Sequence, residues 1–208
     1  MNTLLLYFIS LVTLVILITS VFILGKKRRQ NFNFSTVELA TIAFLICMLY
    51  AAVIPWSFNL NKIPCLDALI FSISYTAILL IGLQIVPRLG TATLLICGQG
   101  LLGQIISRGL NPLWWPYYLA CAAIIELLLL LINYDLKKFA LGIIIAVARV
   151  VISYAYMYLV LAPLVWHKFY PLWYAGLKTS FGIIGSVLGA FIAWKLAPTI
   201  KKITKTIV

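Results

Sequence analysis

Two residues of opposite charge, Glu126 and Arg149, lie inside long apolar stretches of the sequence. A charge at bilayer depth costs at least ~2.5–3.5 kcal/mol on insertion scales, so such a residue usually faces the protein interior and has a function. Glu126 is about twelve residues into its segment and Arg149 about eleven into the next, antiparallel one, which gives similar depths at ~1.5 Å per residue. They could form a structural ion pair, or one or both could contact a polar ligand.

Aromatic, amide and charged side chains gather in the same half of four consecutive apolar segments, and one more aromatic lies in a loop. These candidate binding residues are Gln99, Gln104, Trp115, Tyr118, Tyr154, Lys178 and, in the loop, Trp56. A Trp or Tyr at a segment end is also a typical interfacial anchor. Together with Glu126 and Arg149 they predict an aromatic-lined, partly polar pocket, the usual form of a small-molecule site.

Small residues recur four positions apart on two of the apolar segments. One set is Ala43, Cys47 and Ala51, and the other is Gly185, Gly189 and Ala193. Such faces allow two helices to approach closely. Packing within the bundle would explain either face, and docking to a partner membrane protein is the alternative. We expect the Ala43 face to dock a partner subunit.

Residue patterns typical of catalytic sites are scarce. The one histidine, His167, cannot build a histidine-rich copper or zinc site. The sequence contains no phosphate-binding lysine motif, no nucleotide-binding glycine fingerprint and no GxSxG motif. We therefore expect no enzyme activity, no metal and no cofactor.

The composition is that of a protein solvated by lipid. Apolar residues make up 64% of the 208 residues and charged residues 10%, against ~45–50% and ~25% in average soluble chains. A soluble fold could not bury so much apolar surface. The net charge of +12 does not indicate nucleic-acid binding, because the cations form short runs at the ends of apolar segments.

Seven apolar segments have about the length that crosses a bilayer. They are expected over residues 3–24, 37–54, 68–86, 91–107, 114–133, 139–162 and 172–196. Ser35 or Thr36 should cap the second segment and Pro55 should end it, leaving a loop from Trp56 to Asp67. The predicted fold is an all-α integral membrane protein. An N-terminal anchor helix with a basic turn (residues 1–30) precedes a six-helix domain with a basic tail (residues 31–208).

The distribution of cations predicts the orientation of these segments. If odd-numbered segments run from outside to inside, 11 of the 16 Lys and Arg residues lie at inner ends, 3 in outer loops and 2 within segments. Short inner loops are enriched in Lys and Arg. We therefore expect a multi-pass protein of the cell membrane, with its N-terminus outside and its C-terminus in the cytoplasm.

From the third segment onward the sequence resembles a known family. The turn Pro87-Arg88-Leu89-Gly90-Thr91-Ala92 separates two apolar helices, a Gly-rich stretch runs from Gly98 to Gly103, and a short loop, Gly109 to Pro112, precedes the helix that bears Glu126. Over about residues 35–195 this pattern resembles the substrate-binding S component of energy-coupling-factor ABC transporters. It is most similar to the subgroup associated with thiamine and its hydroxymethylpyrimidine precursor.

The resemblance implies a vitamin importer. An S component binds vitamin at the outer face, associates with a transmembrane T subunit and two ATPases, and topples in the membrane to release the vitamin inside. No ATP site is then expected on this chain. The family has six helices, so the first segment is an addition. Thiamine would present amino groups and a cationic ring to Glu126, which could hydrogen-bond an amino group with charge assistance.

Two other functions remain open from the sequence. The chain could be a structural transmembrane subunit of a larger membrane complex that transports nothing itself. It could also be the membrane subunit of an ammonia or methane monooxygenase, whose helices contain a similar Gly-Thr-Ala-Thr turn. The lack of histidine ligands argues against the monooxygenase.

Overall fold

The computed structural model describes residues 3–28, 32–59, 65–136 and 138–207, and the side chains of 7–28, 32–52, 65–106, 109–136 and 138–200 within them. Over these residues the chain is helical and contains no strand. Seven helices have 13 or more residues. They are α1 (Thr3–Lys27), α2 (Thr36–Asn59), α3 (Leu66–Ile85), α4 (Thr91–Gly103), α5 (Trp115–Leu131), α6 (Phe139–Tyr156) and α8 (Leu172–Ile207).

Shorter helical pieces extend three of these helices or join them. They are two π-helical turns, η1 (Gln104–Arg108) and η3 (Met157–Leu161), a 3₁₀ turn, η2 (Pro112–Trp114), and α7 (Ala162–Val165). Five helical spans of the described chain are long and apolar enough to cross a membrane, and α2 and α4 contribute shorter apolar helices. The predicted all-α class is therefore confirmed, and the five spans indicate a multi-pass membrane protein.

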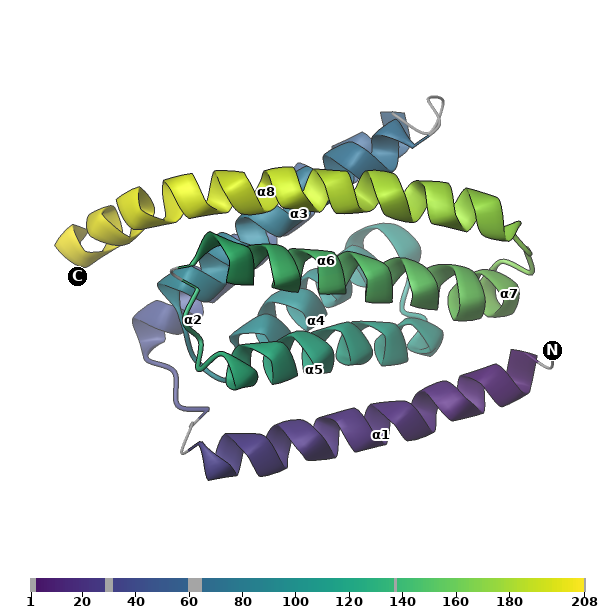
Figure 1. Ribbon diagram of the computed structural model, residues 1–208, viewed down its shortest axis with the longest axis horizontal. Coiled ribbons are helices and arrows are strands. Elements are labelled where there is room, and N and C mark those ends of the chain that lie inside the picture. The colour runs from purple at the N-terminus through teal and green to yellow at the C-terminus, as the bar shows by residue number, and fades with distance from the viewer. Residues whose placement is uncertain (1–2, 29–31, 60–64, 137, 208) are drawn as a thin grey trace.

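Successive long helices alternate in direction, so the bundle has two ends (Figure 1). At the first, α1, α3 and α5 finish; we call it the basic end, and it carries Lys26, Lys27, Arg28, Arg88 and Lys138. At the other, which we call the aromatic end, α5 and α8 begin and α6 finishes; it carries Trp114, Trp115, Trp166, Tyr170 and Trp173. Cations and aromatic rings thus separate along the bundle axis.

Several predicted boundaries were wrong because proline did not stop the helix. The α2 backbone continues through position 55 to Asn59, so Trp56 lies in a helix and not in a loop. Likewise α8 continues through Pro198 to Ile207, where a basic tail was expected. Proline removes one backbone hydrogen bond and strains the preceding turn, which bends a helix more readily than it ends one when the flanking residues favour helix. Ser35 and Glu38 do form the predicted cap, with Ser35 N donating to Glu38 Oε2 at 2.8 Å and Glu38 N to Ser35 Oγ at 3.2 Å.

The closest helix contact joins α3 and α8, whose backbones nearly touch. A Cβ added at Gly185 would lie 2.3 Å from the Leu69 carbonyl oxygen, and one at Gly189 would lie 2.5 Å from that of Ile73. Beside them the Thr76 and Ser186 hydroxyls are 2.9 Å apart and hydrogen-bonded. The small-residue face of α8 therefore serves packing within the bundle.

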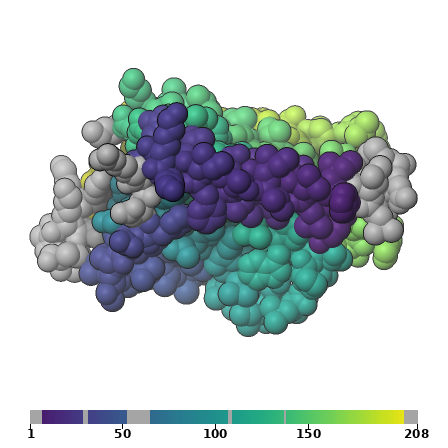
Figure 2. Space-filling view, turned by 90° about the horizontal axis from the view of Figure 1, so that it is seen from below, coloured from purple at the N-terminus to yellow at the C-terminus, as the bar shows by residue number. Residues whose placement is uncertain are grey.

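The additional helix α1 lies along α5 across one face of the molecule, as Figure 2 shows. Leu14 and Val21 are its buried contacts, while most of its apolar side chains are exposed. Ser10 and the Tyr156 hydroxyl are 3.1 Å apart near the aromatic end, and Arg28 donates to the Asn133 side-chain oxygen at the basic end. Polar contacts therefore hold α1 at both of its ends.

Candidate binding cavity

Glu126 lies at the basic end of the bundle, where it caps α4. Its Oε1 accepts hydrogen bonds from the backbone N–H groups of Gly90 at 3.0 Å and Thr93 at 3.2 Å. Gly90 is the N-cap residue of α4 and Thr93 lies in its first turn, and neither N–H group has a partner within the helix. The expectation that Glu126 contacts a ligand in an aromatic pocket is not met by this geometry. The helix α5 ends five residues after Glu126, at Leu131, so this carboxylate is far from the aromatic end.

The residues around Glu126 orient these donors toward its carboxylate. Gly90 has φ of 95°, in the left-handed region that favours glycine, and the Phe32 ring lies where its Cβ would be. The Tyr134 hydroxyl, from the turn after α5, donates to Glu126 Oε2. Burial and the neighbouring carboxylate raise the pKa of Tyr134 well above its ordinary value, so this hydroxyl keeps its proton.

Arg149 does not pair with Glu126, and the prediction that the two could form an ion pair was wrong. The Arg149 guanidinium carbon lies 4.0 Å from the centre of the Tyr75 ring and 5.5 Å from that of Phe71. Arg149 is only 4% exposed, and its Nη1 has no hydrogen-bond partner among the described residues. The ion pairs found in the described chain are Arg88–Glu38 and Lys178–Asp67. Arg149 is therefore a buried cation held by aromatic rings.

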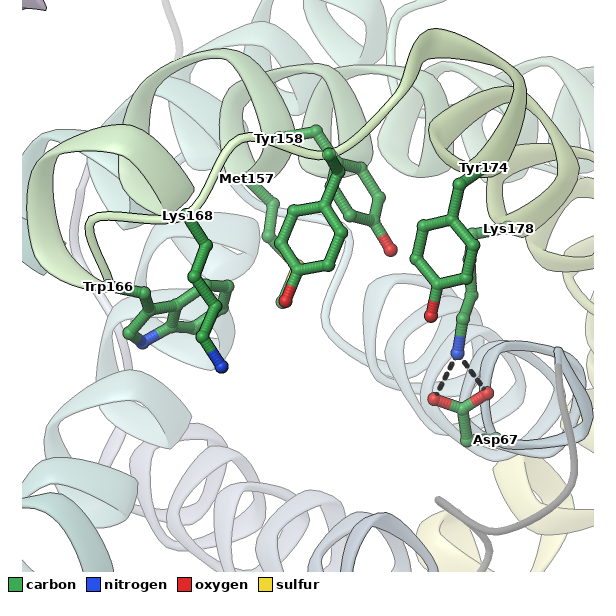
Figure 3. Close-up of a pocket in the computed structure, with 8 residues that line it drawn as sticks. Asp67, Met157, Tyr158, Trp166, Lys168, Tyr174 and Lys178 are labelled. Atoms are coloured by element: carbon green, nitrogen blue, oxygen red, sulfur yellow. Dashed lines mark hydrogen bonds and ion pairs between the residues drawn. The ribbon is translucent and has the colours of Figure 1, made fainter.

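A cavity of about 400 Å³ opens at the aromatic end, between the start of α3, the end of α6 and the start of α8 (Figure 3). Its lining combines aromatic rings, one thioether and three charged groups. The lining residues are Asp67, Met157, Tyr158, Trp166, Lys168, Tyr170, Tyr174 and Lys178. This volume is within the range of small-molecule sites, which are typically ~300–1,000 Å³.

The aromatic wall of the cavity is a set of packed rings. Tyr158 meets Tyr170 and Tyr174 edge-on at 5.3 and 6.2 Å, and Tyr170 stacks on Tyr174 at 5.5 Å. Tyr154, one turn below Tyr158, stacks on it at 6.0 Å. Such contacts fix ring orientation. They present ring faces and hydroxyls to the cavity.

The polar side of the cavity is an ion pair between α3 and α8. Lys178 Nζ donates to both carboxylate oxygens of Asp67, at 2.6 Å to Oδ2. Lys178 is 7% exposed, so Asp67 compensates a charge that would be costly to bury alone. Lys168 projects from the opposite wall beside Trp166, as Figure 3 shows. With one carboxylate and two ammonium groups, the cavity has a net positive charge.

Of the predicted binding residues whose side chains the structure describes, only Lys178 lines this cavity, and Tyr154 stacks on Tyr158 behind its wall. Gln104 is fully buried near the loop, where its Oε1 accepts from Asn111 N at 3.3 Å. Trp115 and Tyr118 pack on each other elsewhere at the aromatic end, at 6.3 Å. Gln99 is half-buried on α4. The side chain of Trp56 lies outside the described residues.

Sequence reasoning missed most of the lining residues because their region was interpreted as a loop with interfacial anchors. Tyr158 lies one turn beyond the predicted Tyr154, and Trp166, Tyr170 and Tyr174 flank the turn after α7. The available signal was their density, with five aromatic side chains between Trp166 and Tyr174. Asp67 carried a second signal, since a carboxylate in the first turn of an apolar helix needs a partner.

The small-residue face of α2 is uncovered. Ala43, Cys47 and Ala51 are all exposed, in contrast to the α8 face, which packs on α3. Partner docking at this face stays a prediction. Comparison of the chain with protein-family models, with curated proteins and with solved structures gives no match.

Proposed function

We propose that this chain is the substrate-binding membrane subunit of a vitamin importer, and that it binds a planar, vitamin-sized heterocycle in the cavity at the aromatic end. The observation that carries the proposal is the cavity itself: four aromatic side chains and an ion pair converge on about 400 Å³ at one end of the bundle. The resemblance to S components of energy-coupling-factor transporters adds the transport role and the expected partners, a T subunit and two ATPases.

The cavity indicates a ligand chemistry that differs from the cationic one predicted from Glu126. That carboxylate is committed to the cap of α4, and Asp67 is paired with Lys178. The argument for a cationic vitamin such as thiamine therefore loses its basis. The neutral hydroxymethylpyrimidine and other flat heterocycles remain, because tyrosine and tryptophan faces stack any planar ring.

Replacing Tyr174 with alanine should weaken ligand binding at least about fivefold, because a stacked or edge-on aromatic contact contributes about 1 kcal/mol beyond its buried area. The experiment is mass spectrometry of small molecules that co-purify with the protein, followed by titration of the identified compound. Trp173→Ala is the matched control, since Trp173 is the neighbouring aromatic, is 70% exposed and does not line the cavity. If Tyr174→Ala and Trp173→Ala bound the ligand equally, the site would have to lie elsewhere. If no compound co-purified with the protein, so that none could be titrated, the result would count against a binding role.

The orientation follows the same proposal, since an importer must present the cavity to the outside. A cysteine introduced at Lys168 should react with a membrane-impermeant maleimide in intact cells, whereas one at Lys138 should react only after permeabilisation. These two residues lie at opposite ends of the bundle and are both exposed. The unsubstituted protein controls for its four native cysteines. Reaction at position 138 in intact cells would invert the topology.

A structural subunit of a larger membrane complex is the second candidate, and the uncovered Ala43 face of α2 is compatible with it. That face would be used by a docking subunit of either kind, so it does not separate the two functions. Ligand binding by the isolated chain does, because a purely structural subunit needs no solute.

A further inference from the structure

We infer that Arg149 is an anion subsite of the cavity and that the bound solute carries a carboxylate or another anionic group. This inference rests on the proposed binding function and names the chemistry of its ligand. It begins from the imbalance of charge around Arg149. The chain has four acidic residues, and none of them forms an ion pair with this buried guanidinium.

Each of the four acidic residues has a position or partner elsewhere than at Arg149. Glu38 pairs with Arg88, Asp67 pairs with Lys178, and Glu126 caps α4. Asp135 lies in the turn after α5, at the basic end. Contact with the Tyr75 and Phe71 rings offsets part of the burial cost of Arg149. These ring contacts leave Arg149 Nη1 without a hydrogen-bond acceptor. An unpaired buried charge usually marks a site for a ligand or a partner.

Two helices carry both residues of the cavity lining and residues around Arg149. On α3, Asp67 lines the cavity, and Phe71 and Tyr75 follow it at four-residue intervals, so the rings that hold the guanidinium lie about 6 and 12 Å below the cavity lining. On α6 and its continuation, Arg149, Ser153 and Met157 share the same spacing, and Met157 lines the cavity. Arg149 itself is not a lining residue, so a solute must extend below the cavity lining to reach it.

Between Arg149 and the cavity lining, the helices also carry buried, neutral hydroxyl groups. Ser153 and Tyr117 share a hydrogen bond between their hydroxyls, and the Ser72 hydroxyl lies beside Tyr154 and Gly182. Aromatic faces above and a guanidinium below suit an aromatic ring that bears a carboxylate. Arginine is the preferred partner for such a group, because its planar donors match the two carboxylate oxygens.

The test uses pyridine-3-carboxylate and pyridine-3-carboxamide, two probes of nearly the same shape that differ in charge. Their binding to the purified protein in detergent is followed by tryptophan fluorescence. Wild type should bind the carboxylate at least about tenfold more tightly than the amide, which corresponds to one charge-assisted contact. Arg149→Met should bind the two equally, and Arg149→Lys should retain part of the preference.

Two further measurements keep the result decisive. Without probe, the thermal midpoint of Arg149→Met should be no lower than that of wild type, since methionine removes an uncompensated charge while keeping much of the volume. Lys138→Gln, which removes an exposed cation at the basic end, should leave the preference for the carboxylate unchanged. A wild type that binds both probes equally would overturn the anion subsite and leave the cavity as a neutral binding site. A preference that survives in Arg149→Met would assign the charge recognition to Lys168 or Lys178, and binding of neither probe, together with no co-purifying compound, would reject the binding function as well.

Discussion

Replacing Glu126 with alanine should lower the stability of the protein by about 3–5 kcal/mol, because the donors that point at its carboxylate would be left in a buried site without an acceptor. A buried donor deprived of its partner costs ~1–3 kcal/mol. The donors are the Gly90 and Thr93 amides, the Tyr134 hydroxyl and, more weakly at 3.5 Å, the Thr93 hydroxyl. The measurement is the thermal midpoint of the detergent-solubilised protein, which should fall by roughly 10 °C for a chain of this length. The thermal midpoint of Glu126→Gln should fall less, since the glutamine side-chain oxygen can still accept one of these hydrogen bonds.

The matched control is the other carboxylate that accepts a backbone amide at a helix N-terminus. Glu38 accepts from Ser35 N at 2.8 Å and pairs with Arg88, but its side chain is partly exposed. Water can replace it, so Glu38→Ala should cost only about 1 kcal/mol. A stable Glu126→Ala variant that has lost its ligand would reverse the structural assignment and restore Glu126 to a binding site.

The helices were predictable because their signal is spread over many residues. Each apolar segment contains enough hydrophobic side chains to specify a membrane-length helix, and every segment predicted from sequence overlaps an observed helix. Where the prediction relied on a single residue it failed: Pro55 was given the weight of a helix end, and the α2 backbone continues past it. The capping pair of Ser35 and Glu38 was recognisable because its donors and acceptors are three residues apart in sequence.

The site was less predictable because its contacts join distant parts of the chain. Glu126 and Arg149 were paired on the basis of depth alone, which ignores the direction in which each side chain leaves its helix. In the fold, Glu126 meets a turn 36 residues earlier, and Arg149 meets rings on α3. Lys178 was selected for its charge within an apolar segment and lines the cavity, but its partner Asp67 is separated from it by 111 residues. Nothing local in the sequence indicates that pair.

The contact between α3 and α8 also decides whether the cavity exists, since these helices carry Asp67 and Lys178. Gly185→Leu should therefore destabilise the fold and abolish ligand binding together. The first side-chain atom would lie 2.3 Å from the Leu69 carbonyl oxygen, and because that obstacle is backbone it cannot rotate away. The helices must separate, at a cost of about 3 kcal/mol or more, the upper part of the range for overpacked cores. Thermal unfolding and ligand titration of the same preparation measure both effects.

Gly176 provides the control on the same helix, because a Cβ there meets nothing within 4 Å. Gly176→Ala should leave binding intact and raise stability slightly, by up to ~1 kcal/mol, through the better helix propensity of alanine. The stability of Gly185→Ala should lie between those of Gly185→Leu and Gly176→Ala, since one methyl group already meets the Leu69 carbonyl. If Gly185→Leu kept both its thermal midpoint and its ligand, α3 and α8 could not be packed backbone to backbone. The Lys178–Asp67 pair that borders the cavity would then need a different explanation.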